Sequence, residues 1–215
     1  TRCEPTDDDE ERGEPMTTWI DDPEGGRDRG PRALARAWAE VLVRPKRFFR
    51  NGVAPADQAP GLVFGVLVAL VAAGGRLATG DLPTFESVDV VPTFVPESAV
   101  LQAVLVLLAV GLFLAPATFH FTAAIETIGL SLLAPDRGGV SETVQVIAYA
   151  TAPCLLTAVP WAPLRVICCL YGAGLLVVGT AVRHRTSIPR AALAAAVPAV
   201  VLFGYGYGGF AAAGL

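Results

Sequence analysis

The strongest constraint on this chain is a series of apolar runs, each about as long as a membrane crossing. A helix needs roughly 20 mostly apolar residues to cross a hydrocarbon core about 30 Å thick. Five runs approach this length, covering about 61–78, 99–121, 143–159, 166–182 and 191–213. With 53% hydrophobic residues and a mean hydropathy of +0.53, the 215 residues hold more apolar material than one soluble core buries. The sequence therefore predicts an all-α polytopic membrane protein with about five transmembrane helices.

The second run has the least certain end. Apolar residues continue past Phe121 to Leu133, which is longer than one crossing requires. Pro116 lacks a backbone donor and its ring clashes with the carbonyl of Leu112, so a break is expected there. Residues 122–133 can then extend the helix, lie on the membrane surface or belong to a re-entrant segment. The sequence leaves these three arrangements open.

The amino-terminal third divides into two segments before the transmembrane domain, which is expected over 59–215. Residues 1–31 are acidic, rich in Gly and Pro and poor in apolar residues, so they are predicted to be disordered.

Residues 32–58 form an amphipathic segment. Leu34, Trp38 and Val41 recur at helical spacing, with basic residues on the opposite face. Basic and aromatic residues together suit an anionic membrane surface, and the alternative is a helix packed on the cytoplasmic loops of the same protein. The candidate lipid-surface contacts are Arg36, Trp38, Arg44, Lys46, Arg47, Phe48, Phe49 and Arg50.

The distribution of Lys and Arg predicts the orientation. Basic residues gather before the first run and after the fourth, whereas the loop at 80–98 holds four acidic residues and no basic one. Short loops rich in Lys and Arg stay in the cytoplasm. A multi-pass protein of the cell membrane is expected, with a cytoplasmic amino terminus and, after five crossings, an outer carboxyl terminus.

A few polar residues and glycines interrupt the apolar runs. Ionisable groups at membrane depth are costly and indicate function by default, although Glu126 and Glu142 can also sit in cytoplasmic headgroups and water. The candidate intramembrane or interface residues are His120, Glu126, Gln145 and Tyr149. Glycines four apart allow close approach of helices, and the candidate packing positions are Gly61, Gly65, Gly204 and Gly208.

Motifs for catalysis are missing from the sequence. There is no HExxH, GxSxG or Walker loop, and His120 and His184 are the only imidazoles. The four cysteines form no CxxC pair, and three lie in apolar runs, where Cys behaves as a small hydrophobe. No enzymatic activity, cofactor or metal site is expected.

Two stretches carry a family resemblance. Residues 38–49 contain Trp38, Val41, Pro45 and Phe48-Phe49 in a W-x2-V-x3-P-x2-FF order, and the stretch 138–160 has the order GG…AYA…P…VP. Together they resemble prokaryotic members of the Yip family, named for proteins that interact with Ypt/Rab GTPases. The resemblance spans about 32–210 and implies a five-span membrane protein without enzymatic activity that organises membranes or recruits partners.

Two departures from the family pattern argue against GTPase binding. A DLYGP-like segment is absent before the first span, and Gln145 stands where family members often carry a basic residue. The favoured function is a scaffold that contacts the anionic inner leaflet and other membrane proteins or further copies of itself, with no nucleic acid. The alternative is a small transporter lined by the polar residues of spans two and three, although the chain shows no internal repeat of the kind many transporters have.

Overall fold

The computed structural model describes residues 20–21, 27–28, 30–81, 98–134 and 137–215. Two two-residue strands, β1 (Ile20–Asp21) and β2 (Arg27–Asp28), pair antiparallel with Ile20 opposite Asp28. Most of the segment predicted to be disordered, 1–31, lies outside the described residues. The helices are α1 (Pro31–Val43), α2 (Pro45–Asn51), α3 (Ala59–Ala78), α4 (Ala99–Ala109), η3 (Val110–Leu114), α5 (Ala115–Leu133), α6 (Val140–Ala150), η4 (Ala152–Ala158), α7 (Ala162–Arg183), α8 (Ile188–Ala199), η5 (Val200–Gly206) and α9 (Gly209–Ala213).

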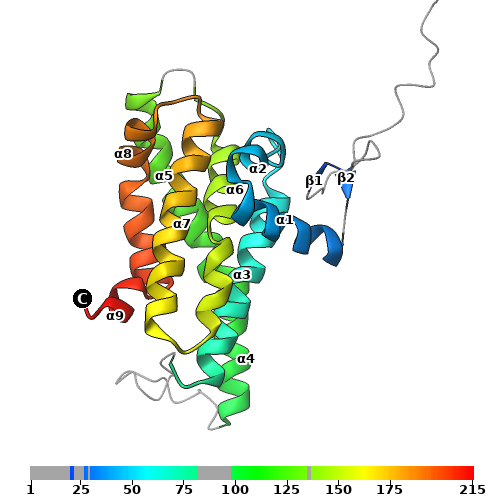
Figure 1. The fold of residues 1–215 in the computed structure, drawn as a ribbon. Coiled ribbons are helices and arrows are strands. Elements are labelled where there is room, and N and C mark those ends of the chain that lie inside the picture. Colours follow the sequence, from blue (N-terminus) through cyan, green and yellow to red (C-terminus); the bar gives the residue numbers. More distant parts are fainter. Residues whose placement is uncertain (1–19, 22–26, 29, 82–97, 135–136) are drawn as a thin grey trace, which may run out of the picture.

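The helical membrane fold class is confirmed. Among the described residues, four helical stretches are long and apolar enough to cross a membrane: Ala59–Ala78, Ala99–Leu133, Ala162–Arg183 and Ile188–Gly206. They lie side by side in one bundle (Figure 1). We call the end of this bundle that holds α2 the α2 end, and the opposite end, near the carboxyl terminus, the α9 end.

The third predicted crossing, 143–159, is not one long helix. It is the α-helix α6 followed by the 3-10 helix η4, whose first turn contains Pro153. A Cβ on Gly61 would lie 2.9 Å from Gln145, and one on Gly75 would lie 2.4 Å from Ala158, so α6 and η4 run alongside α3 from its start to its end. Every residue from 142 to 154 is buried. This segment is therefore the centre of the bundle, which explains why its composition resembles that of a short crossing.

The second run is one continuous helical stretch to Leu133, so residues 122–133 extend the helix and its predicted end at Phe121 is corrected. The helical stretch does not break at Pro116; the π-helix η3 precedes it, and there the amide of Ala115 donates to the carbonyl of Val110. A π-turn shifts the hydrogen-bond partners by one residue, and both π-turns and prolines are common sites of helix kinks.

The last run, predicted over 191–213, ends earlier. Its π-helix η5 stops at Gly206, and Gly208 adopts a left-handed conformation, with φ of 72°, that starts the separate helix α9. Glycine reaches this conformation without the penalty that a Cβ imposes.

The amphipathic segment packs against the bundle with its apolar face. Phe48 and Phe49 are 1% and 0% exposed, so the prediction that they contact lipid is wrong in this structure. The ring of Phe48 meets that of Tyr149 edge-to-face, with centroids 4.8 Å apart. The indole N–H of Trp38 donates to the carbonyl of Ala152 over 2.8 Å. An aromatic ring loses more solvent-exposed area inside the bundle than at a membrane–water interface. The apolar face of this segment therefore packs on the same protein rather than on lipid.

The basic residues of this segment remain at the surface. Arg36, Arg44, Lys46, Arg47 and Arg50 are not buried, which leaves their predicted contact with lipid open.

Candidate functional site

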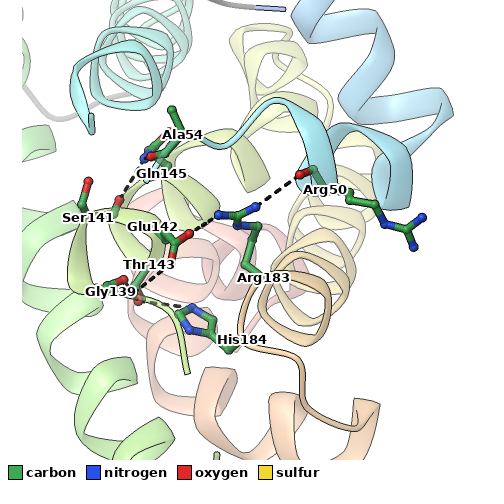
Figure 2. A network of polar contacts seen from close by, with 9 residues as sticks. All are labelled: Arg50, Ala54, Gly139, Ser141, Glu142, Thr143, Gln145, Arg183 and His184. Carbon is green, nitrogen blue, oxygen red and sulfur yellow. Dashed lines mark hydrogen bonds and ion pairs between the residues drawn. The ribbon is translucent and has the colours of Figure 1, made fainter. Parts of the chain in front are cut away.

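The most connected set of polar residues lies at the α2 end (Figure 2). We call it the polar cluster; it comprises Arg50, Ala54, Gly139, Ser141, Glu142, Thr143, Gln145, Arg183 and His184. Its members come from α2 and the residues just after it, from the start of α6 and from the end of α7. The cluster therefore joins three parts of the chain that are far apart in sequence.

Glu142 is the centre of this cluster. One carboxylate oxygen, Oε2, accepts a hydrogen bond from the amide of Gly139 over 2.8 Å, which caps the first turn of α6. The other oxygen, Oε1, accepts one from the guanidinium of Arg183, and Arg183 also donates to the carbonyl of Arg50 over 3.2 Å. Glu142 thus sits in a mostly buried ion pair rather than in headgroups and water, as the interfacial hypothesis held.

Gly138, just before α6, leaves room for this carboxylate. A Cβ on Gly138 would lie 1.9 Å from Oε2 of Glu142. A side chain at this position would displace the carboxylate from its cap and its partner. Gly138 therefore leaves room for the cap that Glu142 makes, whereas a Cβ on Gly139 would meet nothing within 4 Å.

Gln145 binds the chain between α2 and α3. Its Nε2 donates to the carbonyl of Ala54 over 2.6 Å, and its Oε1 accepts from the amide of Ala54 over 3.1 Å. This two-way pairing imitates a backbone pair and needs both a donor and an acceptor, which only an amide side chain supplies at this size. A basic residue here would lose the acceptor half, so Gln145 has a structural role that the resemblance between sequences did not suggest.

His184 was not among the predicted site residues, and it is buried beside Thr143. Its Nε2 lies 3.3 Å from the hydroxyl of Thr143. Burial lowers the pKa of His184 to about 4; Arg183 and Arg137 act in the same direction and Glu142 opposes them. The imidazole is therefore neutral near pH 7. Thr143 and His184 are 41 positions apart, and no local pattern links them.

The four predicted polar residues of spans two and three do not form one site. Glu126 is fully buried and accepts a hydrogen bond from the hydroxyl of Thr180 over 2.5 Å, so it does not lie in headgroups. Tyr149 packs between Phe48 and Phe64, while Gln145 belongs to the polar cluster. His120 is exposed, with Nδ1 2.7 Å from the carbonyl of Pro116. The structure distributes them over separate environments.

A second charged group lies at the α9 end. Asp81 accepts a hydrogen bond from Nε of Arg76 over 3.2 Å and another from Nη2 of Arg165. Partial burial raises the pKa of Asp81, but the two guanidinium groups outweigh it, and the pKa is lowered. The sequence analysis did not predict this group, because its residues lie up to 84 positions apart.

The predicted packing glycines serve contacts within the chain. A Cβ on Gly61 would meet Gln145 of α6, one on Gly65 would lie 2.8 Å from the ring of Phe119, and one on Gly204 would lie 2.4 Å from Phe210. Gly208 differs from the prediction: its left-handed conformation caps α9, and a Cβ there would lie 3.4 Å from the guanidinium of Arg76. Three of the four positions therefore bring elements of this chain together.

The fold and the polar cluster define a polytopic helical membrane protein whose buried polar residues join its own helices. The model of the Yip1 domain matches residues 39–210, which is most of the sequence and includes the polar cluster. The chain belongs to the Yip1 domain family. The comparisons with curated proteins and with solved structures found no match.

Proposed function

We propose that this protein is a non-enzymatic scaffold of the cell membrane that recruits partner proteins at its cytoplasmic face. The observation that carries the proposal is the use of its polar residues. Gln145, Glu142 and Glu126 each bind another part of the same chain. Such contacts fix the shape of a bundle, whereas a permeation path needs polar groups directed into a cavity.

The cavities of the bundle agree with this function. One cavity lies between α7, η5 and α9, and another lies between α3, η3 and η5. Apolar side chains make up most of the walls of both. His120, Glu126, Gln145 and Tyr149 line neither of them.

The proposed orientation places the α2 end in the cytoplasm. The exposed basic residues of α2 lie at this end, as do those after α7, and they suit an anionic inner leaflet. The chain runs the length of the bundle in α3, in α4 to α5, in α6 to η4, in α7 and in α8 to η5, which places the carboxyl terminus at the α9 end (Figure 1). We therefore assign five crossings and an outer carboxyl terminus.

A transporter is the second candidate, and one observation favours it. Oε2 of Glu126 is buried and has no hydrogen-bond partner among the described residues. A carboxyl group in this position can exchange a proton, as in proton-coupled transporters.

Flux measurements separate the two functions. The parent, Glu126→Gln and His120→Gln would be reconstituted into vesicles loaded with a pH-sensitive dye, with protein-free vesicles as the reference. A scaffold gives proton flux equal to the reference for all three proteins, and the same co-purifying proteins from native membranes. Flux in the parent that Glu126→Gln abolishes at unchanged folded yield would overturn the scaffold in favour of the transporter. His120→Gln serves as the matched control because its side chain is exposed.

A further inference from the structure

A lateral groove lies between α3, the α4 to α5 stretch and η5. Its volume is about 420 Å³, within the range of about 300–1,000 Å³ that is common for small-molecule sites. Its walls are mainly small or aliphatic side chains, including Ala69, Ala73, Val110, Leu114 and Leu202. Leu114 is 59% exposed, so the groove opens toward the side of the bundle, where lipid chains lie.

Two π-helices within the described parts of the long helices line this groove. Val110 and Leu114 belong to η3, and Leu202 and Gly206 belong to η5. In η3 the carbonyl of Val110 accepts from the amide five residues later, and in η5 that of Leu202 does the same over 2.9 Å. Each π-helix lies next to a proline, which gives a local reason for the wider turn.

One cationic side chain lines this mainly apolar groove, which Thr118 and Tyr207 also line. Arg76, in the last turn of α3, belongs to its wall and places the charge at the α9 end. Arg76 shares the carboxylate of Asp81 with the buried Arg165, so among the described residues two guanidinium groups face one carboxylate. This group carries a net charge of about +1 because each arginine keeps its proton.

The left-handed Gly208 lets a backbone segment pass close to this charge. A Cβ at that position would lie 3.4 Å from Nη1 and Nη2 of Arg76. Asp81 holds the guanidinium, since Nε donates to its carboxylate and Nη2 to its carbonyl, and the turn before α9 passes beside it. A fixed guanidinium is suited to phosphate, which it binds with two parallel hydrogen bonds.

We propose that this groove binds one acyl chain of an anionic phospholipid, with the lipid phosphate on Arg76. The groove supplies an apolar wall open to the membrane, and Arg76 supplies the charge at the level of the headgroups. The site is distinct from the exposed basic residues of α1 and α2, which lie outside it. The proposal does not depend on the scaffold function.

Native mass spectrometry of the full-length protein tests the proposal with two chain-matched lipids, dioleoyl phosphatidylglycerol and dioleoyl phosphatidylcholine. One phosphatidylglycerol should stay bound, with at least tenfold preference over phosphatidylcholine, and inorganic phosphate alone should not compete at millimolar concentration. Arg76→Gln should remove the preference and Arg76→Lys should retain part of it. Ala73→Phe should fill the groove and reduce binding of both lipids.

Two matched controls locate the effect. Arg137→Gln removes a charge elsewhere, and Ala196→Phe adds a ring to an exposed position of α8 outside the groove. Both should bind phosphatidylglycerol like the parent. Equal binding of the two lipids by the parent, or unchanged binding by Arg76→Gln and Ala73→Phe at parental melting temperature, would overturn the proposal. If Arg76→Gln does not fold, the result for Arg76→Lys and Ala73→Phe decides.

Discussion

Adjacent glycines in α3 give a sharp test of how the third segment packs. A Cβ on Gly75 would lie 2.4 Å from the Cβ of Ala158 and 2.7 Å from both its Cα and its carbonyl oxygen. These atoms belong to the backbone and first side-chain carbon of η4, so no rotamer change can relieve the overlap. A Cβ on Gly74, in contrast, meets its nearest atom, Cδ2 of Leu107, at 4.0 Å. The two positions share a helix and differ in what they face.

The expected magnitudes have opposite signs. Overpacking a tight contact lowers the free energy of unfolding by about 1–3 kcal/mol. Replacing Gly by Ala inside a helix raises it by about 0.5–1 kcal/mol, because Ala has the higher helix preference. Gly75→Ala should therefore destabilise the protein by about 1–2.5 kcal/mol, since its clash lies in the upper half of that range and the helix preference offsets part of it. Gly74→Ala should stabilise it by about 0.5–1 kcal/mol, because only the helix preference acts there.

Thermal unfolding of both variants in the same detergent measures this difference. A separation of about 2 kcal/mol corresponds to roughly 4–8 °C in melting temperature for a domain of this size. The order should be Gly74→Ala above the parent and the parent above Gly75→Ala. Equal melting temperatures for the two variants would refute the close contact between α3 and η4, and with it the third pass through the bundle.

Three further predictions concern topology, pH and the polar cluster. A reporter fused after Leu215 should be active outside the cell when the amino terminus is cytoplasmic, and cytoplasmic activity of that fusion would mean an even number of crossings. The folded pKa of His184 is about 4, below its ordinary value of 6.5, so its contribution to stability is complete above about pH 6.5 and is lost as pH falls toward 4. The melting temperatures at pH 7.5 and pH 5 should therefore differ less in His184→Gln than in the parent. An identical pH dependence of the two proteins would contradict the burial of a neutral imidazole. Glu142→Gln should lower stability by about 1–3 kcal/mol in thermal unfolding, since it leaves Arg183 without its counter-charge; an unchanged melting temperature would show that this pair contributes nothing.

The candidate site was only partly predictable. Gln145, Tyr149 and Glu126 attracted attention because polar groups are rare in apolar runs, and all three are buried. Their partners Ala54, Phe48 and Thr180 lie 54 or more positions away in sequence, so nothing local could pair them. The same holds for His184, which lies just past the end of an apolar run in the sequence and is buried because α6 packs beside it.

In the amphipathic segment, the spacing of apolar residues predicted a helix but not what its apolar face contacts. Helical spacing correctly predicted a helix over α1. The residues from Pro45 onward form a second helix, α2, which the pattern did not predict. An apolar helix face can be buried either in lipid or against protein, and composition alone does not indicate which of the two covers it. The hydrogen bond from Trp38 to Ala152 and the burial of Phe48 show that the apolar face packs against the bundle.

The sequence by itself determined the class of this protein and most of its helices, because the hydrophobic effect and helix periodicity act over neighbouring residues. The apolar runs that became α3 and α7, and the length beyond Phe121, could be measured from the chain alone. Only the tertiary structure decided that the third run is a buried α6 and η4 rather than one long helix, that Glu142 pairs with Arg183, and that Arg76 and Arg165 share Asp81. The pairing of Glu142 with Arg183 and of Asp81 with Arg165 joins residues 41 and 84 positions apart, and such contacts exist only after the helices have packed.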